Sequence, residues 1–109
     1  MLDPEGRIET FNAPAERIKG YPLDEVRGKY YGMFFLPEDR ATGLPEREIE
    51  VARTVGRYEG EGWRLRKDGS RFYAMVSLSA LRDASGELVG FVKVTQDITE
   101  RKKLAEEAQ

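Results

Sequence analysis

Three stretches of the second half alternate between apolar and polar residues, at 58–67, 71–82 and 87–96. Asp68-Gly69 joins the first two stretches, and this dipeptide is a strong signal for a tight turn between antiparallel strands. A slightly longer connection, 83–86, joins the second and third stretches. Because connections this short bring consecutive strands side by side, the sequence predicts a three-stranded antiparallel meander.

The first half indicates short helices rather than more sheet. A turn at 3–6 leads into a predicted short strand, and two short helices ending at glycines follow it. The apolar run that comes next predicts a buried turn or short helix before Pro37, and Pro45 predicts the first turn of a longer helix. The predicted strand covers 7–12, and the predicted helical segments are 13–19, 23–27, 30–36 and 45–55. The predicted fold class is therefore α+β.

The composition excludes several kinds of function. The 109 residues suit one domain, and they include neither Cys nor His, which removes thiolate chemistry and the commonest metal ligand. The net charge of −2 is unlike that of a nucleic-acid-binding protein. The sequence also lacks an apolar stretch long enough for a membrane span and lacks the pattern of a signal peptide. We therefore expect a cytoplasmic protein without a metal site, a nucleic-acid partner or direct membrane insertion.

Several segments, taken in order, resemble the PAS family of sensory domains and its C-terminal PAC motif. The segments are DPEGRIETFNAPAERIKGY at 3–21, LDEVRGK at 23–29, PEDR at 37–40 and RKDGSRFYAMVSLSALRDASGELVGFVKVTQDITERK at 66–102. The sequence is most similar to PAS modules that precede bacterial histidine kinase or diguanylate cyclase outputs. This resemblance implies a five-stranded antiparallel sheet with short helices on one face.

The resemblance also raises a question about the first strand of that sheet. In the family a full strand precedes the turn at 3–6, whereas here only Met1 and Leu2 do so. A vacant slot beside the last strand would expose unpaired backbone groups. We therefore expect a neighbouring chain or a rearranged terminus to fill the slot.

The family's cofactors can be tested against the composition. Haem held by His, and flavin or a pigment linked through Cys, are excluded because both residue types are absent. A non-covalent flavin, another small organic ligand and no ligand at all stay open. Neither a phosphate-binding glycine motif nor a nucleophile elbow is present, so the domain itself is predicted to be non-catalytic.

Strand alternation and the resemblance together predict a pocket. Alternation puts Phe72, Ala74, Val76 and Leu78 on one face of the middle strand, and Tyr73, Met75 and Ser77 on the other. The resemblance turns the first set inward together with Phe91, Lys93 and Thr95, whereas simple burial would favour Val92 and Val94. The candidate pocket residues are Phe34, Trp63, Phe72, Ala74, Phe91, Lys93 and Thr95. Ordinary core or sheet-surface packing is the alternative for the aromatic residues among them.

Charged residues near this pocket also allow specific expectations. Lys93 should either meet a carboxylate, from Glu59 or Glu61, or a ligand anion, or extend to the pocket rim. The basic residues around the Asp68-Gly69 turn are expected to be solvated, and an anion site is the alternative. They are Arg64, Arg66, Lys67 and Arg71.

The end of the chain is predicted to relay a signal. Asp97 and Glu100 have the spacing of a capping box, which predicts a helix of about 11 residues that is marginal on its own. The alternatives are a frayed tail or a helix folded back on the sheet. The resemblance instead implies a continuing helix that joins an output domain. Under this interpretation residues 1–98 are the sensor, 99–109 begin the signalling helix, and the relay consists of Asp97, Ile98, Thr99 and Glu100.

We therefore expect a sensory domain of a bacterial signalling protein, with a histidine kinase or a cyclic-nucleotide enzyme as the parent. Such a domain is expected to be a homodimer. The alternative is a ligand-free dimerisation or docking module that uses the outer face of the sheet. The residues predicted for that face are Phe11, Tyr73, Val92 and Val94.

Overall fold

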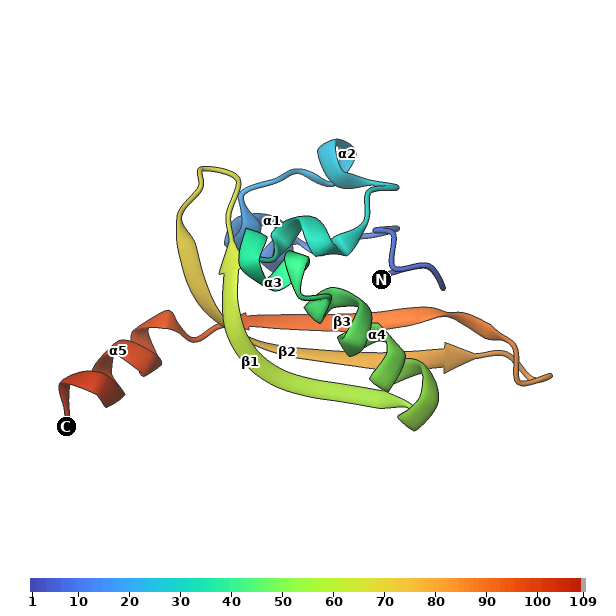
Figure 1. Ribbon diagram of the computed structural model, residues 1–109. Coiled ribbons are helices and arrows are strands. Elements are labelled where there is room, and N and C mark those ends of the chain that lie inside the picture. Colours follow the sequence, from blue (N-terminus) through green and yellow to red (C-terminus); the bar gives the residue numbers. More distant parts are fainter. Residues whose placement is uncertain (109) are drawn as a thin grey trace.

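The computed structural model describes residues 1–108 and has the predicted meander as its framework. Strands β1 (Arg57–Leu65), β2 (Arg71–Arg82) and β3 (Leu88–Asp97) form one antiparallel sheet in the order β1-β2-β3 (Figure 1). The predicted bounds of β2 are correct, and those of β1 and β3 differ by at most two residues. The α+β fold class is therefore confirmed.

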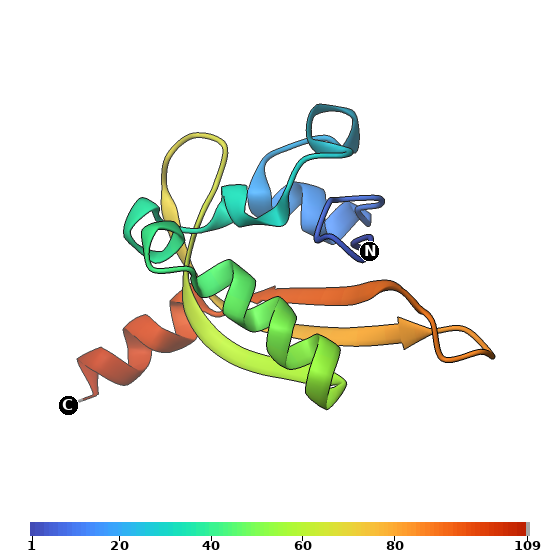
Figure 2. The same ribbon diagram turned by 45° about the vertical axis from the view of Figure 1, so that its right-hand side comes forward.

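Short helices cover one face of this sheet (Figures 1 and 2). The elements before the sheet are α1 (Ala13–Lys19), α2 (Leu23–Val26), η1 (Tyr31–Phe34), α3 (Pro37–Ala41) and α4 (Leu44–Val55). In α1 the Asn12 side chain accepts a hydrogen bond from the Ala15 amide at 2.9 Å, and Gly20 ends the helix in the left-handed conformation. Helix α5 (Thr99–Glu107) extends away from the body, so the folded-back alternative is wrong. No described helix is long and apolar enough to cross a membrane.

The predicted strand at 7–12 is reduced to isolated bridges. Arg7 pairs with Tyr30 and Ile8 with Leu2, without forming a continuous strand. Leu2 also pairs with Phe91 of β3, with N–H to carbonyl distances of 2.8 and 2.9 Å. The first residues of the chain thus fill the slot beside the start of β3. Beyond Phe91, no described residue pairs with that edge of β3.

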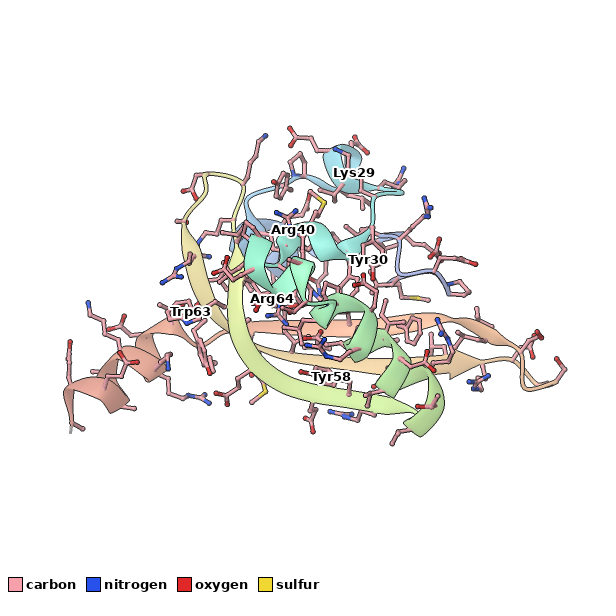
Figure 3. All side chains as sticks on the ribbon, in the orientation of Figure 1. Lys29, Tyr30, Arg40, Tyr58, Trp63 and Arg64 are labelled. Carbon is pink, nitrogen blue, oxygen red and sulfur yellow. The ribbon has the colours of Figure 1, made fainter. Side chains whose placement is uncertain are left out.

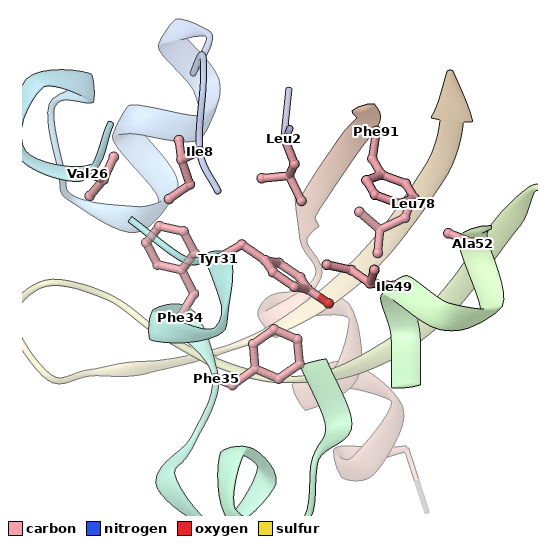
Figure 4. Packing of buried hydrophobic residues seen from close by; sticks show 10 residues of the cluster. All are labelled: Leu2, Ile8, Val26, Tyr31, Phe34, Phe35, Ile49, Ala52, Leu78 and Phe91. Carbon is pink, nitrogen blue, oxygen red and sulfur yellow. The ribbon is translucent and has the colours of Figure 1, made fainter. Parts of the chain in front are cut away.

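The main core lies between η1, α4 and the sheet (Figure 4). Tyr31, Phe34 and Phe35 from η1 and its end are each at most 1% exposed. The rings of Tyr31 and Phe35 meet edge to face at 5.3 Å, and the Tyr31 hydroxyl donates to the Pro45 carbonyl at 2.6 Å. A second, smaller cluster under α1 contains Phe72, Ala74, Val76 and Ile18.

Candidate ligand cavity and its link to the exit helix

The register of the sheet decides which side chains of β3 face the helices. Lys93 lies opposite Leu78, and Thr95 opposite Val76; both partners are fully buried on the helix-covered face. Val92 and Val94 point the other way and are 37% and 52% exposed. The structure therefore has the orientation implied by the family resemblance. Burial logic failed because the helix-covered side of β3 adjoins a cavity, which accommodates polar side chains.

This cavity has a volume of about 330 Å³ and lies between α1, residues 8–12, η1 and the edge of β3. Its size falls within the usual range for small-molecule sites. The aromatic and aliphatic lining comes mainly from Ile8, Phe11 and Phe34, and Thr10, Asn12 and Thr95 add polar groups. The lining includes Lys19 and Lys93 but no acidic residue. The full set is Met1, Leu2, Ile8, Thr10, Phe11, Asn12, Pro14, Ala15, Lys19, Tyr31, Phe34, Val92, Lys93, Val94 and Thr95.

The two lysines lack counterions. Lys19 is 3% exposed, and its ammonium lies 4.4 Å from the centre of the Phe34 ring. The Lys93 ammonium donates to the Thr95 hydroxyl at 3.2 Å. Across residues 1–108, no carboxylate oxygen lies within 4.0 Å of either ammonium. Each cation therefore depends on aromatic faces and neutral polar atoms.

Burial lowers the pKa of both lysines, because loss of water disfavours the ammonium form. The pKa of Lys93 falls from 10.5 to about 8. The pKa of Lys19 falls well below its usual value, and repulsion from Lys93 adds to the effect of burial. The predicted partners of Lys93 are wrong. Glu59 and Glu61 belong to the opposite face of the sheet, since they pair in register with the outward residues Ser77 and Met75.

A buried ion pair lies behind the cavity. Arg64 of β1 and Glu48 of α4 are 3% and 1% exposed, and their side chains meet at 2.8 Å. The Arg64 guanidinium stacks 3.9 Å from the centre of the Phe35 ring. Burial raises the pKa of Glu48, while Arg64 acts to lower it. The prediction of a solvated Arg64 is therefore wrong, because the side chain turns inward beneath the helices (Figure 3).

Three of the seven predicted pocket residues line the cavity, namely Phe34, Lys93 and Thr95. Phe91 belongs to the main core, and Phe72 and Ala74 belong to the second cluster. Trp63 is on the outer face, where its ring lies 5.1 Å from that of Tyr73 (Figure 3). The prediction for Phe11 is wrong, because this residue lines the cavity although it was not among the predicted pocket residues. It was expected on the outer sheet face, but its ring lies 5.9 Å from Phe34 and lines the cavity.

Sequence reasoning missed Lys19, Thr10 and Asn12 as cavity residues. Lys19 stands in the last turn of α1, where a cation is normally explained by the helix dipole. One signal could have singled it out. Lys19 follows Ile18, whose side chain packs on the second cluster, and it precedes the left-handed Gly20 that turns the chain. This turn ties the end of α1 to the body of the protein and leaves Lys19 inside.

Arg66 connects the end of α1 with the end of β3. Its guanidinium donates to the Ile18 carbonyl at 2.7 Å and pairs with the Asp97 carboxylate at 2.9 Å. The neighbouring Lys67 amide donates to the Lys19 carbonyl at 2.9 Å. The backbone of Lys19, whose side chain lines the cavity, is thus held by the loop that also holds Asp97.

Asp97 does not form the predicted capping box with Glu100. The N-cap of α5 is Ile98, and it receives no side-chain hydrogen bond. Asp97 instead accepts hydrogen bonds from the Thr99 amide, at 3.0 Å, and from the Thr99 hydroxyl. Partial burial acts to raise the pKa of Asp97, but these bonds and Arg66 hold it below its usual value. The box fails because Asp97 still belongs to β3 and turns one oxygen to Arg66.

The start of α5 is also attached to β2. The Thr99 hydroxyl accepts from the Tyr73 amide at 2.9 Å, and the Ile98 amide donates to the Tyr73 carbonyl at 2.8 Å. Ile98 is 7% exposed, so it anchors the helix start in the body. No cluster of three or more acidic, His or Cys side chains that could hold a metal occurs in the described part of the chain.

Known proteins are similar to this chain in sequence and in fold. The family model described as "PAS domain" matches residues 1–100. Two-component system protein A of Emericella nidulans is 50% identical over 103 residues, which cover 94% of this chain and 15% of that protein. The solved PAS domain of a Colwellia psychrerythraea protein is 25% identical with a TM-score of 0.83, and the match covers 91% of this chain and 83% of that chain.

A second solved structure, the dark state of the blue-light photoreceptor Aureochrome1 LOV, is 27% identical with a TM-score of 0.76. This match covers 98% of our chain and 80% of the other. The chain thus spans about a seventh of the curated relative and most of each solved domain. Because the family model covers nearly the entire chain, this chain belongs to the PAS domain family.

Proposed function

We propose that this domain senses a small molecule in the cavity beside Lys19 and Lys93 and relays its presence to α5. One observation carries the proposal. The cavity is lined by α1 and β3, and Arg66 joins the ends of these same two elements. A ligand that alters the spacing between α1 and β3 therefore also acts on the contact that positions Asp97.

The relay runs through hydrogen bonds rather than through a large movement. Asp97 holds Thr99, and Thr99 in turn accepts from the Tyr73 amide. A shift of Arg66 changes how firmly this first turn of α5 is held. A ligand can bias such an equilibrium only by its difference in affinity for the two states. A preference of a few kcal/mol is enough to change the dominant population.

The parent is proposed to be a cytoplasmic signalling protein of the two-component kind, such as a histidine kinase. In it, residues 1–98 act as a non-catalytic sensor and 99–109 begin the connection to an output domain. The extensive likeness to a two-component system protein supports this assignment. That relative is fungal, so the bacterial setting stays a prediction.

The cavity is compatible with a flavin only in a non-covalent form. A flavin would supply light absorption and electron transfer when bound, and its phosphate suits the lysines that line the cavity. The absence of Cys removes any thiol that could add to its ring. The absorption spectrum of the purified protein tests this cofactor, because a bound flavin absorbs visible light and the apoprotein does not.

A second candidate function, homodimerisation through the outer sheet face, rests on exposed apolar side chains. Val92 and Val94 are 37% and 52% exposed, and Leu104 of α5 is 58% exposed. Covering such a surface is favourable, because apolar area leaves water. This role and ligand sensing are compatible, because the cavity lies on the helix side of the sheet.

The relay is tested by Arg66→Met in the full-length parent. This change removes the bonds to Ile18 and Asp97 but keeps the stem that covers Phe72. We expect the output activity to shift while the fold is kept. Arg27→Met, at an exposed arginine outside the relay and the cavity, is the matched control. Unchanged output in a folded Arg66→Met variant would refute the relay.

A further inference from the structure

The charge around the cavity is not balanced by the protein. Lys19, Lys93 and Arg64 are basic, and Glu48 is the one carboxylate that acts on Lys93 and Arg64, so these four side chains carry a formal net charge of +2 when all are ionised. Glu48 is already engaged by Arg64 at 2.8 Å. The remaining positive charge belongs to the two lysines, which lie on facing elements, α1 and β3, and both line the cavity.

The rest of the lining is suited to an apolar group with few polar contacts. The rings of Phe11 and Phe34 lie 5.9 Å apart and form one wall. The side chains of Thr10, Asn12 and Thr95 add neutral polar atoms, and no acidic side chain is present to repel an anion. Unpaired buried charge is costly, and a ligand of opposite charge removes that cost.

We propose that the cavity takes a small organic acid, with its carboxylate or phosphate between the ammonium groups of Lys19 and Lys93 and its apolar body against Phe11 and Phe34. This inference rests on the proposed sensing function and specifies the chemical class of the ligand. An inorganic anion would pair with the two lysines but would leave the rings of Phe11 and Phe34 without an apolar group to pack against them. Neutral aromatic molecules satisfy the wall but leave the lysines unpaired.

The position of Lys19 strengthens the inference. A lysine near a helix end usually extends into water, yet this one is 3% exposed with its ammonium 4.4 Å from the Phe34 ring centre. No oxygen in the described part of the chain accepts a hydrogen bond from it, and its hydrogen-bonding neighbour is the amine of Lys93. The cation is therefore positioned in advance, and a ligand acid group would complete its contacts.

The experiment compares three probes of similar size by calorimetry and NMR: phenylacetate, phenyl phosphate and the neutral phenylacetamide. At least one acid should bind, and about tenfold or more tightly than the amide, because charge-assisted hydrogen bonds are stronger than neutral ones. The two acids distinguish a carboxylate from a phosphate. Lys19→Met and Lys93→Met should each weaken the acid by about tenfold or more and leave amide binding nearly unchanged.

Lys29→Met is the matched control, since Lys29 is exposed beside α2 (Figure 3) and its side chain does not line the cavity. It should leave acid binding unchanged. The proposal is overturned if the amide binds as tightly as both acids, if an acid still binds the double lysine variant, or if neither acid binds at millimolar concentration. Folding of each variant is checked by its NMR spectrum before titration.

Hydrogen exchange of residues 97–107 separates this proposal from the sensing function. If a neutral probe binds and changes exchange in α5, sensing holds and the acid class is wrong. If an acid binds with the expected lysine dependence and exchange in α5 stays the same, the acid class holds and the relay is wrong.

Discussion

The half-buried Lys93 should make the stability of the ligand-free domain rise with pH above neutrality. Its pKa is about 8 in the folded protein, against 10.5 for a solvated lysine. Below pH 8, Lys93 is protonated in both the folded and the unfolded state. Burying its charge then lowers the free energy of unfolding by about 3 kcal/mol. Between pH 8 and 10.5 the unfolded chain binds the proton more strongly, so the free energy of unfolding increases with pH.

Between pH 7 and pH 9 the expected gain is about 1 kcal/mol, or about 5 °C in Tm for a domain of this size. Besides burial, Arg64 disfavours the charge of Lys93, whereas a hydrogen bond with the Lys19 amine and the charge of Glu48 favour it. Lys19 has a lowered pKa too and adds a change of the same sign. Tyr31 opposes the trend only above about pH 10, because burial keeps its proton in the folded state.

Urea unfolding at pH 7, 8 and 9 measures this slope. Lys93→Met should be more stable than the wild type at pH 7, by about 1–3 kcal/mol, and should show a smaller pH dependence. The residual slope belongs to Lys19 and to the Met1 amino group, whose pKa burial also lowers, so it should shrink further but not vanish in the double variant. Lys29→Met exchanges an exposed lysine in the same way and should keep the wild-type slope. A wild-type stability that is flat or falling from pH 7 to pH 9 would refute the reasoning.

Three further changes test other parts of the structure. Glu48→Gln leaves the buried Arg64 without its counterion and should lower the free energy of unfolding by about 3–5 kcal/mol in urea. Asp97→Ala breaks a partly exposed pair with Arg66, so it should cost only about 1 kcal/mol, yet hydrogen exchange at the start of α5 should become clearly faster. Val94→Lys places a charge on the exposed outer face and should weaken a homodimer in sedimentation; an unchanged dimer would exclude this face as the interface.

Local signals explain which parts of the fold the sequence predicts well. The alternation across 71–82 and the turn at Asp68-Gly69 specify a hairpin without reference to the rest of the chain. Asn12 and Gly20 likewise mark both ends of α1, and the predicted bounds of that helix are correct. Each of these signals acts within a few residues, so the local sequence alone is enough to predict the hairpin and the bounds of α1.

The site depends on contacts between residues that are far apart in the chain, and such contacts are poorly predicted. Glu48 and Arg64 are 16 positions apart and look like ordinary surface charges until α4 is placed against β1. The capping box at Asp97 failed for a related reason. Arg66, 31 positions earlier, competes for its carboxylate, and no local pattern reveals that competition. The inward direction of Lys93 was predicted only because the family resemblance supplied the register.

The two lysines also explain why binding and relay can share a single mechanism. Lys93 disfavours the charge of Lys19, and the two side chains reach the same cavity from β3 and from α1. An acid group between them would replace that repulsion with attraction and draw the two elements together. A ligand at 100 times its Kd stabilises the bound state by about 2.7 kcal/mol, which is close to the cost of burying the Lys93 charge. Since Arg66 joins α1 to β3 through Ile18 and Asp97, the same movement changes the contacts that hold the start of α5.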